Sequence, residues 1–237
     1  MSNLVHRPSS GLPATSLPWL SLRDHFVATV GPHAGSGRPL GPLLVLADAT
    51  FAPRSRFPLH PHREVEILSI VVEGRLSHHG DQAHGATLGP RSAQLISART
   101  GIVHAEGNDT DEPTRMLQLW FEPNRQGGAP AYFARTLSGA GRELVAGDEA
   151  MPLRAEARVW WLSFAPGSRE RLSVPRGGHG YLLGLRGSVR SETTSDHAPV
   201  RLEPGDGAEV GEGEVVLVPS GTEPAAAIWI ELPTARP

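Results

Sequence analysis

Glycine and proline interrupt this sequence so often that long helices have little room to form. The chain has 27 Gly and 22 Pro among its 237 residues, well above the ~12% of average usage. Short runs rich in Val, Ile, Leu and Trp lie between them. The clearest runs are 41–51, 65–79, 92–98, 115–123, 158–167, 180–191, 199–210, 214–221 and 226–233. This spacing predicts an all-β sandwich or barrel, with short helices at most, for example a turn or two within 16–26.

A weak internal repeat indicates two similar domains. Residues 67–77 resemble 181–191: each has an apolar strand, then a charged residue with Gly, then a second strand. Aligning Gly74 with Gly187 gives a shift of 113 residues (187 − 74), about half the chain. The turn-rich stretch 122–132 is the expected joint. We therefore predict an N-terminal domain over 1–128 and a C-terminal domain over 129–237.

Composition excludes several kinds of chemistry. The chain has no Cys, and all 22 of its basic residues are Arg, so thiolate nucleophiles, disulfides, iron–sulfur clusters and Schiff-base lysines are impossible. A formal net charge of −3, with both signs spread along the chain, gives no sign of nucleic-acid binding. No apolar run is long enough for a membrane span, and no secretory signal is recognisable. We expect a cytoplasmic protein that binds neither nucleic acid nor membrane.

Two pairs of potential metal ligands share one spacing. His60 and His62 flank Pro61, which favours an extended backbone, so both imidazoles project to the same side. His104 and Glu106 form a second i, i+2 pair. Either pair alone is more often a surface pair than a ligand set. Together, on two strands of one barrel, they predict three imidazoles and one carboxylate around a single ion. Such donors suit Fe(II), Mn, Ni or Cu(II), and they are compatible with Zn.

The residues around these pairs resemble a known family. Residues 60–80, HPHREVEILSIVVEGRLSHHG, followed by 97–108, SARTGIVHAEGN, are similar to the paired motifs of the pirin family in the cupin superfamily. The resemblance covers 41–135 closely and continues weakly through the second half. It implies a bicupin, two tandem β-sandwich barrels in one chain. It also implies one divalent metal, commonly Fe(2+), held in the N-terminal barrel by the motif residues His60, His62, His104 and Glu106.

The resemblance further implies an activity. Some relatives resemble quercetin 2,3-dioxygenases, oxidoreductases that open the heterocyclic ring of flavonols with dioxygen. Glu106 would then be the catalytic general base, and the partners would be a small aromatic substrate and dioxygen. One alternative is a metal-binding, redox-sensitive regulatory protein that acts through protein partners. Another is a cupin enzyme that acts on a different small substrate.

Several other residues receive simpler interpretations. Glu64 or Glu66 is expected to orient a ligand histidine, and Arg99, where relatives usually have Gly, to narrow the pocket mouth. The second barrel is expected to bind no metal, because the shift of 113 places Ser173 and Pro175 where the first has His60 and His62. The remaining histidines are expected to face solvent or to pack without binding metal: His78, His79 and His84 at a turn, and His179 and His197 in the second half.

Overall fold

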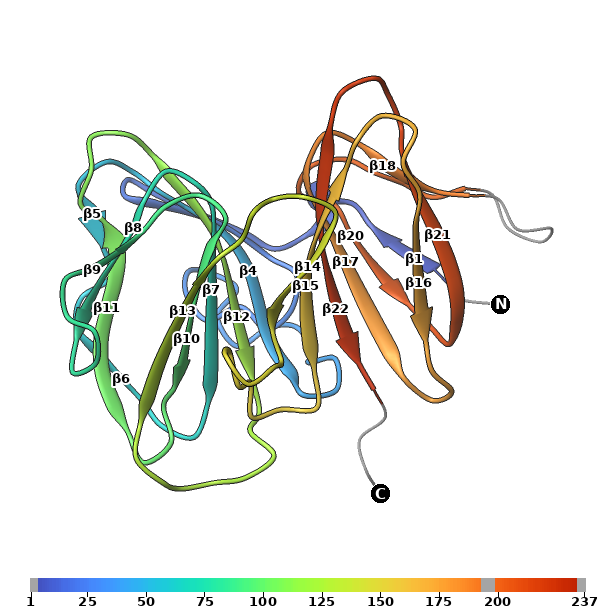
Figure 1. Cartoon of the computed structure of the whole chain (residues 1–237). Coiled ribbons are helices and arrows are strands. Elements are labelled where there is room, and N and C mark those ends of the chain that lie inside the picture. The colour runs from blue at the N-terminus through green and yellow to red at the C-terminus, as the bar shows by residue number, and fades with distance from the viewer. Residues whose placement is uncertain (1–3, 193–198, 234–237) are drawn as a thin grey trace. The chain divides into compact units, whose positions relative to one another are not determined.

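The computed structural model describes residues 4–192 and 199–233. Apart from one 3-10 turn, η1 (Ser9–Gly11), the regular elements of these residues are strands (Figure 1). The short helix expected within 16–26 does not form. Strands β2 (Ala14–Leu17) and β3 (Leu20–Asp24) form a hairpin there, in which Ser16 pairs with Ser21. Within the described residues no helix is long and apolar enough to cross a membrane.

An N-terminal unit spans Pro13–Leu137 and Ala146–Ala155. Its seven-stranded sheet has the order β13-β10-β7-β12-β4-β3-β2, and its second sheet has the order β5-β11-β8-β9, with β6 also paired to β11. The first sheet contains β2 (Ala14–Leu17), β3 (Leu20–Asp24), β4 (Leu43–Phe51), β7 (Glu66–Glu73), β10 (Ser92–Ser97), β12 (Thr114–Phe121) and β13 (Ala131–Thr136). The second contains β5 (Ser55–Arg56), β6 (His60–His62), β8 (Leu76–Gly80), β9 (Ala86–Leu88) and β11 (Ile102–Asn108).

A C-terminal unit contains the start of the chain up to Leu12, Ser138–Val145 and the chain from Glu156 on. Its two sheets have the orders β1-β20-β17-β22-β15-β14 and β16-β21-β18-β19. The first contains β1 (Leu4–Arg7), β14 (Arg142–Ala146), β15 (Arg158–Phe164), β17 (His179–Arg186), β20 (Gly207–Val210) and β22 (Ala225–Leu232). The second contains β16 (Glu170–Val174), β18 (Val189–Ser191), β19 (Arg201–Leu202) and β21 (Gly213–Pro219).

The internal repeat has a structural counterpart. The order β10-β7-β12-β4 in one unit matches β20-β17-β22-β15 in the other. Gly74 and Gly187, which the repeat aligns, both have positive φ, 76° and 59°. A Cβ at either glycine would collide with the carbonyl oxygen of a proline, Pro113 or Pro224, just before the neighbouring strand. Glycine is therefore needed at the same turn of both barrels. The matching strand orders give the chain an all-β, bicupin architecture.

The predicted boundaries at 128 and 129 differ from those of the units. β1 pairs with β20 and lies with the C-terminal unit, although it belongs to the first 128 residues. β13 follows the predicted joint, yet it pairs with β10 of the N-terminal unit. The repeat identified the central strands of each barrel but not the edge strands. An edge strand joins its sheet by hydrogen bonds to a segment that can be distant in the sequence, and the repeat does not show such pairing.

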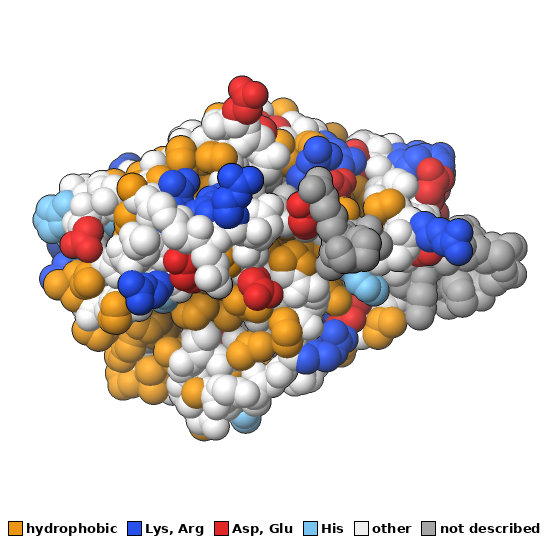
Figure 2. Space-filling view, turned by 90° about the horizontal axis from the view of Figure 1, so that it is seen from below, with side chains coloured by type: hydrophobic (Ala, Val, Ile, Leu, Met, Phe, Trp, Pro, Cys, Tyr) orange, Lys and Arg blue, Asp and Glu red, His pale blue; other side chains and the backbone are white. Residues whose placement is uncertain are grey.

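The two barrels are filled differently. In the C-terminal unit fully buried apolar side chains, among them Leu182, Val189 and Trp229, fill the space between the sheets. His179 is exposed, and His197 lies outside the described residues. In the N-terminal unit an apolar cluster that includes Phe51 and Met116 occupies part of the interior. On the face shown in Figure 2, arginine and acidic side chains are interspersed among apolar ones.

Candidate metal centre

Strand pairing brings three histidines together. β6 lies antiparallel to β11, with His60 opposite His104 and His62 opposite Ile102. The ring centroids are 4.8 Å apart for His60–His62, 4.7 Å for His60–His104 and 5.0 Å for His62–His104. One ring nitrogen from each lies within 4.8 Å of the other two. We call His60, His62 and His104 the outer triad.

Glu106 meets a different histidine. β8 also pairs with β11 and places His78 directly opposite Glu106. His78, His104 and Glu106 offer three donor atoms within 4.8 Å of one another, and we call them the inner triad. His78 was expected at a surface turn, but it is fully buried on a strand. Its neighbour His79 points the other way and bonds Asp109 at 2.9 Å, because alternate side chains of a strand face opposite sides.

Hydrogen-bond donors fix the Glu106 carboxylate. Ser69 Oγ donates to Oε1 at 2.5 Å, and Gln94 Nε2 donates to the same oxygen. The hydroxyl of Tyr132 in turn donates to Gln94 Oε1 at 3.0 Å. Each of these polar groups holds the next in place, so the carboxylate is set in one orientation before any ion binds.

Gln118 completes this network once its amide is oriented. Rotating the amide by half a turn lets its nitrogen donate to Glu106 Oε2 and to Ser69 Oγ, both at 3.2 Å. Its oxygen then accepts from Trp120 Nε1 at 3.2 Å. Ser69 has a single hydroxyl hydrogen, which goes to Glu106, so it must accept from Gln118. We therefore assign the rotated amide, which gives both carboxylate oxygens of Glu106 a donor.

Burial sets the charge state of the centre. Burial, together with the smaller effect of the neighbouring histidines, lowers the pKa of both His62 and His104 to about 3. Both rings are therefore neutral near pH 7 and can bind a metal without first losing a proton. Burial raises the pKa of the Glu106 carboxyl above its usual value, while the Ser69 hydrogen bond opposes that rise.

The residues that orient the ligands differ from those expected. His60 Nδ1 lies 2.8 Å from the carbonyl oxygen of Pro58, which leaves Nε2 free to face the cluster. Glu64 instead accepts hydrogen bonds from the backbone N–H of Gly127 at 3.0 and 3.1 Å. Glu66 accepts from Ser97 Oγ at 2.5 Å and from the Arg154 N–H at 3.3 Å. Neither carboxylate bonds a ligand histidine.

Arg99 does not narrow the pocket, contrary to expectation. It has a positive φ of 45°, and its Nε donates to Ser97 Oγ at 3.1 Å. Through Ser97 it belongs to the group around Glu66 and does not line the cavity at the outer triad. Arg99 therefore lies outside the lining of the cavity, and its side chain does not reduce the space there.

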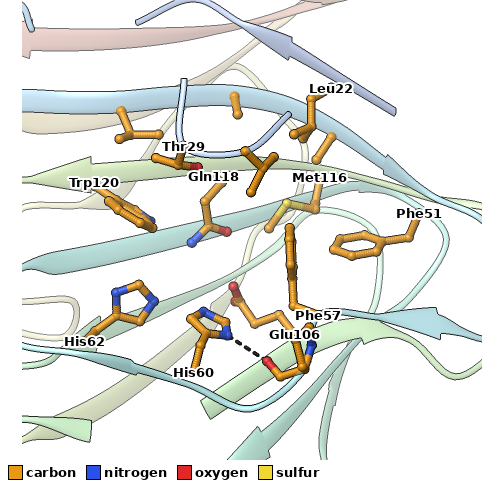
Figure 3. Close-up of a pocket in the computed structure, with 15 residues that line it drawn as sticks. Leu22, Thr29, Phe51, Phe57, His60, His62, Glu106, Met116, Gln118 and Trp120 are labelled. Atoms are coloured by element: carbon orange, nitrogen blue, oxygen red, sulfur yellow. Dashed lines mark hydrogen bonds between the residues drawn. The ribbon is translucent and has the colours of Figure 1, made fainter. Parts of the chain in front are cut away.

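A cavity of about 310 Å³ opens beside the outer triad. His60, His62, Glu106 and Gln118 line it on one side (Figure 3). The rest of the lining is apolar except for Thr29: Leu22, Val30, Val45, Ala47, Ala49, Phe51, Phe57, Pro58, Met116 and Trp120. Trp120 packs edge-on against His62, with ring centroids 4.9 Å apart. The site thus combines nitrogen and oxygen donors with an apolar chamber of small-molecule size.

The donor atoms fit a divalent transition metal. His104 is almost fully buried, and neither of its ring nitrogens makes a hydrogen bond. Buried polar atoms in native proteins are nearly always paired, so an ion is the natural partner for this ring. Neutral imidazoles and a carboxylate match the preferences of first-row divalent metals. Within the described residues, both donor clusters belong to the N-terminal unit.

The barrel and its donor cluster define a cupin, a class in which a β-sandwich barrel holds a metal inside. The family model named Pirin matches residues 13–121. A Pseudomonas aeruginosa protein named "Putative quercetin 2,3-dioxygenase" is 31% identical over 238 residues, which cover 97% of this chain and 99% of its own. The chain belongs to the pirin family.

Solved structures show the same fold. The bacterial pirin YhhW of Escherichia coli, crystallised in complex with nickel(II), superimposes with a TM-score of 0.86 at 20% identity, covering 99% of this chain and 100% of its own. A quercetin 2,3-dioxygenase of Acinetobacter baumannii gives a TM-score of 0.70 at 19% identity, covering 98% of this chain and 85% of its own. At these identities the likeness concerns the fold.

Proposed function

We propose that this protein is a metal-dependent dioxygenase that opens the heterocyclic ring of flavonols such as quercetin. The observation that carries the proposal is the cavity of about 310 Å³, which has His60, His62, Glu106 and Gln118 on one side and a mostly apolar lining elsewhere. A flat aromatic molecule with a chelating pair of oxygens fits such a cavity, because its oxygens can face the donor side and its rings can lie against the apolar lining. The name of the Pseudomonas aeruginosa relative supports the same substrate class.

The ligand residues proposed are His60, His62, His104 and Glu106, and the metal proposed is Fe(2+). When bound, such an ion supplies Lewis acidity toward a hydroxyl group and redox chemistry toward dioxygen. The chain's own residues do the rest. The outer triad presents neutral imidazoles, and His60 is held in one tautomer by the Pro58 carbonyl.

Glu106 is the proposed general base. It lines the cavity and is the only carboxylate that does so among the described residues. The hydroxyl of a bound flavonol would lie beside the metal ligands, within reach of this side chain. Oε1 accepts from both Ser69 and Gln94, whereas Oε2 accepts from Gln118 at 3.2 Å, so Oε2 is the oxygen proposed to accept the proton.

The apolar walls hold the rings and keep water out. Phe57, Met116 and Trp120 give the aromatic skeleton extensive van der Waals contact. Exclusion of water strengthens every electrostatic interaction at the donor side and protects a reactive intermediate from hydrolysis. Among the described residues, Thr29 and Gln118 are the polar lining groups outside the predicted ligand set.

The test is aerobic incubation of metal-loaded protein with quercetin, followed by loss of the flavonol absorption band. Iron, manganese, nickel and copper are loaded separately. We expect bleaching with at least one metal, and loss of at least 100-fold in rate for His62→Ala. His179→Ala, an exposed histidine of the other unit, is the control and should keep full activity. No turnover with any metal would contradict the proposal and favour the regulatory alternative.

A further inference from the structure

His78 is placed by its strand in the centre of the N-terminal barrel. The β8–β11 register sets it opposite Glu106, so the two side chains share one face of the sheet. Its ring centroid lies 5.4 Å from that of His104 and 5.4 Å from that of Tyr132. It is fully inaccessible to solvent. The ring therefore lies in the interior of the unit and does not line the cavity.

The polar atoms of this ring are poorly paired within the protein. Neither Nδ1 nor Nε2 of His78 makes a hydrogen bond of good geometry, although both are buried, and the backbone of Gln82 is the hydrogen-bonding group that acts on the ring from nearby. His104 is in the same condition. By contrast, Ser69 and Gln94 donate to the neighbouring Glu106, and Tyr132 donates to Gln94. Two adjacent buried imidazoles without a well-formed hydrogen bond are exceptional, since native interiors pair such groups with protein, water or an ion.

A single partner can serve both rings. One donor atom each from His78, His104 and Glu106 lies within 4.8 Å of the other two, as in the outer triad. Two imidazoles and a carboxylate form a donor set that binds divalent transition metals. His104 belongs to both triads and so links the two donor sets.

We propose that His78 is a further ligand of the metal centre, binding the ion from the inner side together with His104 and Glu106. The centre then contains four imidazoles and one carboxylate, one imidazole more than the motif residues supply. This inference rests on the metal site of the proposed function and adds a residue to it. It concerns ligation alone and does not depend on which substrate is oxidised.

The experiment uses the full chain loaded with Co²⁺, a paramagnetic probe. Each ligating imidazole gives a strongly shifted N–H proton signal in the NMR spectrum, and this signal disappears in D₂O. We expect four such signals in the wild-type protein and three in His78→Phe, which keeps a ring packed against Tyr132. His78→Gln serves as a second variant should the first fail to fold, and it should also show three. His79→Phe, one residue along the strand and turned outward, should keep four.

Metal affinity gives a second readout. Competition with a chromophoric chelator should show Co²⁺ bound at least 10-fold more weakly by His78→Phe than by the wild type, with His79→Phe unchanged. Three shifted signals in wild type and in His78→Phe alike would overturn the inference, even if affinity falls, because His78 would then act only as a neighbour of Glu106. Failure of the wild-type protein to bind Co²⁺, or equal Co²⁺ affinity in the wild type and in His104→Ala, would overturn the metal centre as a whole.

Discussion

At the scale of single residues, the buried polar groups around Glu106 determine what the centre can hold. Ser69 and Gln94 both donate to Oε1, and Tyr132 fixes Gln94. A carboxylate held in this way is already oriented for an ion, so an incoming metal does not have to order it. The hydrogen-bond donors Ser69 and Gln94 therefore support the proposed metal site, although neither is among its proposed ligands.

Removing one donor should weaken metal binding without removing a ligand. In Gln94→Met the carboxylate loses its amide donor, while the volume of the side chain is kept. Partners of metal ligands typically contribute 10- to 100-fold in affinity, so we expect a Kd for Co²⁺ about 10-fold higher, measured by chelator competition. Gln126→Met changes an exposed glutamine of the 122–130 loop and serves as the control. Equal affinities for the two variants would show that Gln94 does not orient Glu106.

Asp24 should make stability depend on pH. Its carboxyl lies buried at the end of β3 without a hydrogen-bond partner, and this burial raises its pKa from 3.8 to about 6, with His33 opposing the rise. The unfolded chain therefore releases the proton at lower pH than the folded one. Stability should fall as the pH rises from about 4 to about 6 and stay lower above that.

The neutral variant Asp24→Asn should remove this dependence. At pH 8 we expect it to be more stable than the wild type by up to about 3 kcal/mol, and the difference should vanish below pH 4. Urea unfolding at a series of pH values measures it, and the exposed Glu149→Gln serves as the control. A variant less stable than the wild type at pH 8 would show that Asp24 has a stabilising partner when ionised.

The sequence drew attention to single residues that a motif carries, whose role as ligands stays a prediction, and it missed residues that no motif carries. The outer triad and Glu106 stood out because both pairs have i, i+2 spacing and match a family pattern. His78 was missed because HHG followed by Asp and a Gly-containing stretch looks like a turn, and only the β8–β11 register shows that it faces inward. Arg99 was misplaced for the same reason: its direction depends on a positive φ that no composition reveals.

At the scale of elements, β11 organises the site because three strands pair with it. β6 delivers His60 and His62, β8 delivers His78, and β11 itself carries His104 and Glu106. Since side chains alternate along a strand, a slip of one residue between β8 and β11 would turn His78 outward. The sequence predicted β8 from an apolar run, and β6 and β11 from their i, i+2 pairs, but it did not show which residues pair across these strands.

Gly80 should be the position that fixes this register. It pairs with His104 and has a φ of 148°. A Cβ there would collide with the Val103 carbonyl oxygen and lie 2.7 Å from the His104 Cα. Gly80→Ala should therefore push β8 away from β11 and displace His104, lowering both the Co²⁺ affinity and the free energy of unfolding, the latter by about 2 kcal/mol or more.

A matched glycine gives the control. A Cβ at Gly89 would have no atom within 4 Å, so Gly89→Ala should change stability by less than about 0.5 kcal/mol. Denaturant unfolding and chelator competition on both variants measure the effects. Full metal affinity in Gly80→Ala would mean that β8 can move without disturbing His104, and it would argue against a fixed β8–β11 register.

At the scale of the whole molecule, the two units use one sheet order and differ in where their edge strands come from. The seven-stranded sheet has β13 beside β10, and the corresponding place beside β20 is taken by β1. The repeat in the sequence reveals the shared order, because each copy keeps its central apolar strands and its glycine turn. It does not reveal β1, which lies far from its partner along the chain: Leu4 pairs with Val210.

Because β1 pairs with β20, the start of the chain is part of the C-terminal barrel. Deletion of residues 1–8 removes β1 and leaves β20 at the open edge of its sheet. It also removes the half-exposed His6, whose ring nitrogen lies 3.1 Å from the Asp206 carboxylate. Leu4, which packs against the apolar cluster of that unit, is lost as well. The C-terminal unit should therefore lose on the order of 2 kcal/mol of stability, and the exposed edge should promote association between molecules.

The deletion should leave the metal centre intact, because the strands that carry it lie in the N-terminal unit. Hydrogen exchange measures both effects in one experiment: protection should fall in β17 and β20 and stay unchanged in β8 and β11. Light scattering should show association that increases with protein concentration, while the Co²⁺ affinity stays within 2-fold of the full chain. Unchanged protection in β20 would mean that β1 contributes nothing to its sheet. A loss of metal affinity would mean that the two barrels are energetically coupled and fold as one unit.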